Sequence, residues 1–210
     1  MDRRLLPIAA ALAAAAGSCS VTAPSVAFSA VCAPPDAASC TFSATCDAQY
    51  IGQVTMDVAV TNQLWLAVEV HNQAADNSDP AMGRPNTQDA YVQEIDVSYQ
   101  GAVAIPSTES LVQQRVPANG TAVISIFPVP ASAGVTSASV GAGSAAVILA
   151  KVKGRGVFGD GSSFQTPVYE IPFLMCNGCL GATPPCADPT QSLALCPPND
   201  GQTPLTAACQ

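Results

Sequence analysis

Residues 145–173 read AAVILAKVKGRGVFGDGSSFQTPVYEIPF, two apolar segments on either side of a glycine-rich turn. From 146 to 152 apolar residues recur at every second position, which is the period of a half-buried strand. The Gly-Asp-Gly turn at 159–161 tolerates positive φ. The pattern therefore predicts a long β-hairpin. Pro167 and Pro172 cannot donate to a hydrogen-bond ladder, so we expect the returning arm at a sheet edge or a bulge.

The same two-residue period recurs upstream in shorter segments. They lie at 54–60, 64–71, 91–99 and 122–126, and more weakly at 102–105 and 111–116. About seven short strands separated by Gly, Pro, Asn and Ser predict an all-β fold, an antiparallel β-sandwich of the immunoglobulin or fibronectin kind. Trp65, the only tryptophan, is a candidate anchor for its core.

The composition excludes two broad classes of protein. Hydrophobic residues make up 49% of the 210 residues and charged residues 10%, and the formal net charge is −8. The hydrophobic share excludes a disordered chain, although the charged share is well below that of an average soluble domain. The acidic balance offers no basic footprint for a duplex, so nucleic acid is excluded as a partner.

The first 18 residues have the organisation of an export signal. A basic pair precedes an apolar run from 5 to 16, which is too short to span a membrane. Small residues then lead to Cys19, and this junction resembles a bacterial lipobox, in which the cysteine thiol is diacylated before cleavage. We therefore expect a lipid on Cys19; the alternative is an ordinary secretory signal cut near residues 17–18. Ser20 resembles an outer-membrane sorting signal.

Eight further cysteines form two groups, three before residue 47 and five after residue 175. Exported cysteines are normally oxidised, which predicts four disulfides. Since three cysteines cannot pair among themselves, at least one disulfide should join the two ends and constrain the unfolded chain by about 4–5 kcal/mol. The disulfide candidates are Cys32, Cys40, Cys46, Cys176, Cys179, Cys186, Cys196 and Cys209.

Cys176-Asn-Gly-Cys179 is a C-x-x-C motif with more than one interpretation. A zinc site needs further ligands, which Cys186 and Cys196 could supply. A redox-active pair usually opens a helix, and the glycine and prolines that follow disfavour one. A structural disulfide is the favoured interpretation, and metal binding or redox exchange is the alternative.

The polar segment 72–89, NQAADNSDPAMGRPNTQD, is long for a β-connection, and long loops on a rigid scaffold often bind partners. Contacts there should be hydrogen-bonded and salt-sensitive. Its carboxylates could offer ligands to calcium, but their spacing does not match an EF-hand, and a loop capped by Asx turns is favoured. The candidate binding residues are Asp76, Asn77, Asp79, Arg84, Asn86 and Asp89.

Candidates for catalysis are sparse. His71 is the only histidine, and no G-x-S-x-G nucleophile motif is present. The carboxylate pairs Glu94/Asp96 and Glu69/Asp57 lack the aromatic surroundings of a glycosidase cleft and are expected on solvated strand faces. We expect no catalytic residue, no metal and no cofactor.

These features divide the chain into five segments. They are a signal peptide (1–18), a lipid-anchored tether (19–31), a cysteine loop (32–46), the β-sandwich domain (47–175) and a cysteine-rich tail (176–210). The disulfides are expected to staple the two terminal segments to the sandwich.

Three stretches carry a resemblance: GRPNTQDAYV (83–92), IDVSY (95–99) and GSSFQTPVYEIPFLMCNGC (161–179). With the lipobox-like start, they resemble uncharacterised exported lipoproteins of myxobacteria and relatives. The resemblance implies an outer-membrane-anchored β domain and supplies no catalytic residue. We thus expect a non-enzymatic envelope lipoprotein with a binding or structural role. Its partners would be the membrane, through Cys19, and an envelope protein.

Overall fold

The computed structural model describes most of the chain between residues 25 and 179 and two short pieces of the tail. The described residues are 25–32, 45–46, 49, 54–59, 61–179, 193–195 and 207–209. Besides strands they form two 3-10 turns, η1 (Pro80–Met82) and η2 (Ala131–Ala133). None of the described residues lies in a helix long and apolar enough to cross a membrane.

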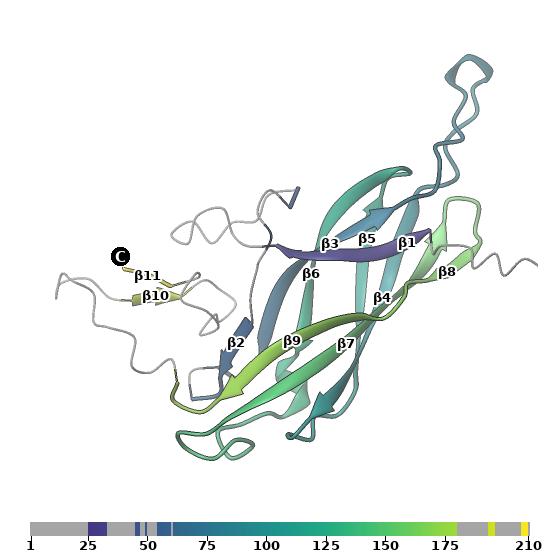
Figure 1. The fold of residues 1–210 in the computed structure, drawn as a ribbon. Helices are drawn as coiled ribbons and strands as arrows, with labels where there is room; N and C mark the ends of the chain where they lie inside the picture. The colour runs from purple at the N-terminus through teal and green to yellow at the C-terminus, as the bar shows by residue number, and fades with distance from the viewer. Residues whose placement is uncertain are drawn as a thin grey trace, which may run out of the picture.

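The strands are arranged in two main sheets. They are β1 (Val26–Cys32), β2 (Val54–Asp57), β3 (Leu64–Asn72), β4 (Ala90–Gly101), β5 (Thr108–Val116), β6 (Gly120–Val129), β7 (Ala145–Phe158), β8 (Ser163–Gln165), β9 (Tyr169–Cys176), β10 (Leu193–Leu195) and β11 (Ala207–Cys209). The smaller sheet has the order β1-β3-β6, and the larger has the order β2-β9-β7-β4-β5 with β8 beside β7. Figure 1 shows the smaller sheet lying across the larger one, which curls. The predicted all-β, sandwich-like architecture is confirmed.

The core lies between the two sheets and is built from alternate residues of their strands. On β7, Ile148, Ala150 and Val152 are fully buried, and Phe173 on β9 is the largest fully buried side chain. Burying a side chain of this kind stabilises the fold by about 1.5–3 kcal/mol. The period-two pattern of the sequence therefore reports directly which face of each strand is inside.

The predicted hairpin over 145–173 is also confirmed. β7 pairs with β9 from Ala145 opposite Cys176 to Val152 opposite Tyr169, and its far end pairs with β8. Pro172 lies just before Phe173, where the pairing of β9 with β2 begins. Among the described residues, the outer side of β9 is thus open at Pro172, which is the edge position that a proline requires.

One glycine of the hairpin is needed for close backbone approach. A Cβ on Gly156 would lie 2.0 Å from the carbonyl oxygen of Tyr91 on β4. The β4 register shifts between Val92 and Glu94, which is the sign of a β-bulge at this position. Only glycine lets the bulged strand pack this closely.

The structure contradicts part of the predicted tether, residues 19–31, because strand β1 lies there. Residues 26–31 belong to β1, and Val26 and Phe28 are buried. The buried residues of β1 alternate, but the intervening Ala27 and Val31 are also apolar or small, so the sequence shows no clear contrast between the two faces of the strand. The expectation is therefore wrong for 26–31, while residues 19–24 lie outside the described residues.

Three smaller predictions from the sequence also differ from the structure. Trp65 is half-buried on the outer face of β3 because it alternates with Leu64 and Leu66, which face the core, so it is not the core anchor. The weak segment 102–105 is part of the β4–β5 connection rather than a strand. The first predicted strand ends early, at Asp57.

Candidate functional site

The connection between β3 and β4 spans residues 73–89, and residues 73–88 of it project from one end of the sandwich as a narrow finger (Figure 1). Its two arms are joined by reciprocal backbone hydrogen bonds between Asp79 and Arg84, both 2.9 Å long. Closer to the sandwich, the Asn77 amide donates to Thr87 Oγ1 at 2.8 Å, and the Thr87 N–H donates to Asn77 Oδ1 at 2.9 Å. The finger is therefore a preformed arm with its own ladder of polar contacts.

The carboxylates of the finger cap its backbone. Asp76 Oδ1 accepts the Ser78 N–H at 2.7 Å, and this hydrogen bond lowers the pKa of Asp76. Asp79 Oδ1 accepts the Met82 N–H at 3.2 Å at the start of η1. These are the Asx-type caps expected for the loop. The groups of three His, Cys, Asp or Glu ligands found among the described residues lie elsewhere and include no carboxylate of the finger.

A fully buried amide, Asn72, fixes the base of the finger. Its Nδ2 donates to the carbonyl oxygens of Gln88 at 2.8 Å and Val116 at 3.2 Å, and its Oδ1 accepts the Ala74 N–H at 3.0 Å. One side chain thus joins both arms of the finger to the end of β5.

Asp89 holds the other side of the base and is also buried. It accepts hydrogen bonds from Arg115 Nε at 2.7 Å, the Ala118 N–H at 3.0 Å and the Asn86 amide at 3.0 Å. The Asp89 carboxylate raises the pKa of the Arg115 guanidinium. Asp89 is therefore a structural group of the finger base and is not presented to solvent.

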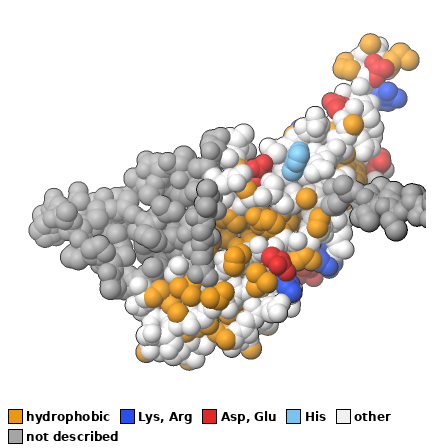
Figure 2. Space-filling view, viewed as in Figure 1, with side chains coloured by type: hydrophobic (Ala, Val, Ile, Leu, Met, Phe, Trp, Pro, Cys, Tyr) orange, Lys and Arg blue, Asp and Glu red, His pale blue; other side chains and the backbone are white. Residues whose placement is uncertain are grey.

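The tip has a different character from the rest of the finger. Met82 is 81% exposed, and Pro80, Ala81 and Pro85 are exposed beside it. Figure 2 shows this apolar cluster at the far end of the finger, with acidic and basic side chains beside it. The Arg84 guanidinium has no ion pair within the described part of the chain. Of the six sequence-predicted binding residues, the structure brings Arg84 to the tip, places Asp76, Asn77, Asp79 and Asn86 in hydrogen bonds of the finger, and places Asp89 at its base.

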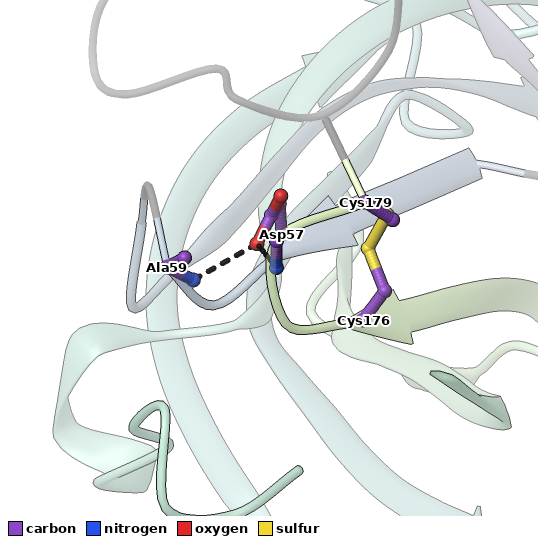
Figure 3. Close-up of a disulfide and its surroundings, with 5 residues drawn as sticks. Asp57, Ala59, Cys176 and Cys179 are labelled. Carbon is purple, nitrogen blue, oxygen red and sulfur yellow. Dashed lines mark hydrogen bonds between the residues drawn. A yellow bond between two sulfur atoms is a disulfide. The ribbon is translucent and has the colours of Figure 1, made fainter. Parts of the chain in front are cut away.

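At the opposite end of the sandwich, a disulfide joins Cys176 to Cys179 (Figure 3). Cys176 is fully buried and Cys179 is exposed. Asp57 is fully buried beside them, and its Oδ1 accepts the Gly178 N–H at 2.8 Å and the Ala59 N–H at 2.9 Å. The motif therefore carries one accessible sulfur, one buried sulfur and a buried carboxylate.

The same three groups are close enough together to form a set of metal ligands. A carboxylate oxygen of Asp57 and the sulfur atoms of Cys176 and Cys179 lie within 4.8 Å of one another. The disulfide occupies both sulfurs, and thiolates are the form that binds zinc. Metal binding here would require prior reduction.

Sequence reasoning missed a charged ladder on the outer face of β7. Lys151, Lys153 and Arg155 occupy alternate positions and line a groove of about 530 Å³. Arg155 contacts Glu94 at 2.7 Å and Asp96 at 2.6 Å. The signal was visible, because these are three of the five basic residues after position 18. The ion pairs are partly exposed, so their contribution to stability is small.

The remaining catalytic candidates are separated. His71 lies on the outer face of β3, opposite Ala27 of β1 and Thr121 of β6. Glu69 belongs to the same strand, whereas Asp57 belongs to the larger sheet. The pair Glu69/Asp57 is therefore not brought together.

Comparison with known proteins adds no relative. A scan against protein-family models finds no match, and a search of the curated proteins finds none either. The function is therefore inferred from the geometry of the finger and of the Cys176–Cys179 disulfide.

The two described disulfides sharpen the expected pairing. Cys32 bonds to Cys46, with their Cα atoms 5.3 Å apart, and Cys176 bonds to Cys179. The side chains of the other four candidates, Cys40, Cys186, Cys196 and Cys209, lie outside the described residues.

We predict that Cys40 is the N-terminal partner in a disulfide joining the two ends. With Cys32 and Cys46 paired to each other, it is the only cysteine left in its group if all eight are oxidised. Non-reducing peptide mapping should find Cys40 linked to a cysteine beyond residue 180. In a Cys40→Ser variant, alkylation should then label one thiol, and that thiol should lie in the tail. A free Cys40 thiol in the native chain would contradict the prediction.

Proposed function

We propose that this protein is a non-enzymatic lipoprotein of the cell envelope, held at the outer membrane by a lipid on Cys19. The disulfides support an exported, non-reducing location. Kinship with the exported lipoproteins of myxobacteria, and an immunoglobulin- or fibronectin-like origin of the sandwich, belong to the same proposal. The fold serves as a rigid carrier, and its task is binding.

The observation that carries the binding role is the finger, residues 73–88. Its polar groups are already engaged in holding its shape, so little conformational entropy is lost when the tip makes a contact. The exposed tip offers Met82 and Arg84. In this proposal the contact is mainly apolar with a single cation, in place of the polar, salt-sensitive contact predicted from the sequence.

Replacing Cys19 by alanine tests the anchor. The variant should move from the membrane fraction to the soluble fraction on cell lysis, because the diacyl chain is the only stable anchor in the proposal and binding by the finger alone is weak and reversible. Fractionation and intact mass of the wild-type chain measure this. An unmodified wild-type N-terminus at Ser20 or Val21 would refute the lipoprotein.

Shortening the finger tests the binding role. In the Cys19→Ala background, replacing residues 78–85 with Gly-Ser-Gly should abolish sedimentation with washed envelopes. The thermal midpoint should stay within about 4 °C of the parent, since the Asn72 and Asp89 contacts remain and loop closure depends only weakly on length.

Leu111→Ser is the matched control for this experiment. Leu111 is 84% exposed on β5, outside the finger. The substitution therefore removes an exposed apolar side chain, as the loss of Met82 does in the shortened finger. The control should bind envelopes like the parent. Equal binding by the shortened chain would place the working surface elsewhere.

A second candidate function is thiol–disulfide exchange at Cys176–Cys179, favoured by the buried Asp57 carboxylate. A thiolate of a dithiol reductant attacks the exposed Cys179 sulfur, the S–S bond breaks, and the Cys176 sulfur leaves with the electron pair and takes a proton. The second thiol of the reductant then releases Cys179 as a thiol and leaves as the oxidised reductant. In this proposal Asp57, which has a carboxylate oxygen within 4.8 Å of the Cys176 sulfur, supplies that proton.

Asp57→Asn separates this role from a structural one. Asparagine keeps an oxygen that can accept the Ala59 and Gly178 N–H groups but cannot transfer a proton. If exchange is the function, reduction of Cys176–Cys179 by dithiothreitol should slow about tenfold or more. Timed alkylation and mass spectrometry measure it, with Cys32–Cys46 as the internal reference. Unchanged or faster reduction would leave Asp57 a purely structural residue.

A further inference from the structure

The chain enters the sandwich at the base of the finger. Ser25, the residue before β1, accepts the N–H of Gln73, the first finger residue, at 2.6 Å. Val26 pairs with Asn72, the residue that fixes the finger base. The segment leading back to Cys19 and the finger therefore leave the same end of the molecule.

The length of chain between Cys19 and Ser25 limits how far this end can stand from a lipid on Cys19. Six peptide steps span at most about 22 Å when fully extended. A flexible coil of this length would span about 13 Å on average. A lipid on Cys19 would thus keep Ser25, and the finger base with it, close to the membrane surface.

The finger is longer than this average separation. From Ala74 to Met82 the extended arm reaches up to about 26 Å, taking the rise of a β-strand. The tip therefore meets the bilayer whenever the finger tilts by less than about 60° from the membrane normal, if the base lies about 13 Å away.

The tip suits the boundary between headgroups and acyl chains. Its apolar side chains are exposed, and two of its backbone N–H groups are satisfied internally, since the Met82 N–H bonds to Asp79 and the Gly83 N–H bonds to Pro80. A buried apolar group beside a basic side chain that reaches the phosphates is the usual composition of interfacial anchors. Arg84 supplies that basic group.

We propose that the finger tip, Met82 with Pro80 and Ala81, inserts into the interface of the bilayer that carries the Cys19 lipid, with Arg84 at the lipid phosphates. This inference rests on the proposed lipidation. It makes the membrane itself the finger's partner and fixes the orientation of the sandwich. The end with Cys176–Cys179 then points away from the lipid.

Methionine oxidation tests the proposal on the native chain. In water, Met82 is exposed while Met56 and Met175 are fully buried. The lipidated protein is reconstituted in phosphatidylcholine vesicles and treated with chloramine-T. Oxidation of Met82 should be about fivefold or more slower than in the soluble Cys19→Ala chain. Met56 and Met175 should stay unoxidised in both, which confirms an intact fold.

A depth measurement provides the second readout. The Met82→Trp variant is placed in vesicles whose lipids carry brominated acyl chains, and the fluorescence of the introduced indole should fall about twofold. The native Trp65, at the far end of β3, should not be quenched, nor should a tryptophan introduced by Ala142→Trp in the exposed loop before β7.

The outcomes separate the anchor from the finger. A wild-type chain that fails to float with the vesicles refutes the lipid on Cys19 and this inference with it. A chain that floats but shows rapid Met82 oxidation, and no quenching of the indole introduced by Met82→Trp, keeps the anchor and overturns the membrane contact. Protection of Met82 only when envelope proteins are added would assign the tip to a protein partner and also overturn it.

Discussion

The hydrogen bonds of the buried Asn72 amide are the contacts on which the finger and its end of the sandwich depend. The amide lies at the last residue of β3, and its hydrogen bonds reach the end of β5 and both arms of the finger. A buried amide left without these partners would cost about 1–3 kcal/mol, so its partners are held tightly in place. The two sheets and the finger thereby meet at one fixed point, and Asp89 reinforces it with a charge.

Much of the fold follows from local pattern. The hairpin of β7 and β9 was predictable because its apolar residues keep a strict period and its turn contains Gly161, whose φ is +84°. β1 was not predictable, because Ala27 and Val31 on its outer face are also apolar or small and hide the alternation of its buried residues. Pairing between distant segments, such as β2 with β9, leaves no local trace at all.

The sequence pattern indicated which loop forms the candidate site, but it did not indicate which side chains the loop exposes. Polar residues in a loop predict polar contacts with a partner, whereas the structure shows that Asp76, Asn77 and Asp79 bond within the finger. The side chains left exposed at the tip are those of Arg84, which the sequence pointed to, and Met82, an apolar residue that composition gave no reason to notice. Likewise, the neighbour of the C-x-x-C motif, Asp57, is more than a hundred residues away in the sequence.

The pairing of β2 with β9 is the one parallel pair between the described strands, and it bears on the order of folding. Val54 pairs with Phe173, so β2 can form its pairing only after β9, which follows much later in the sequence, is available. Pairings this distant close slowly and late because the loop between them must first be ordered. β1 and β3 can meet early, but β2 keeps an open edge until residues 173–176 arrive. If the chain crosses a membrane from its N-terminus, its larger sheet is therefore complete only after residues 173–176 have crossed.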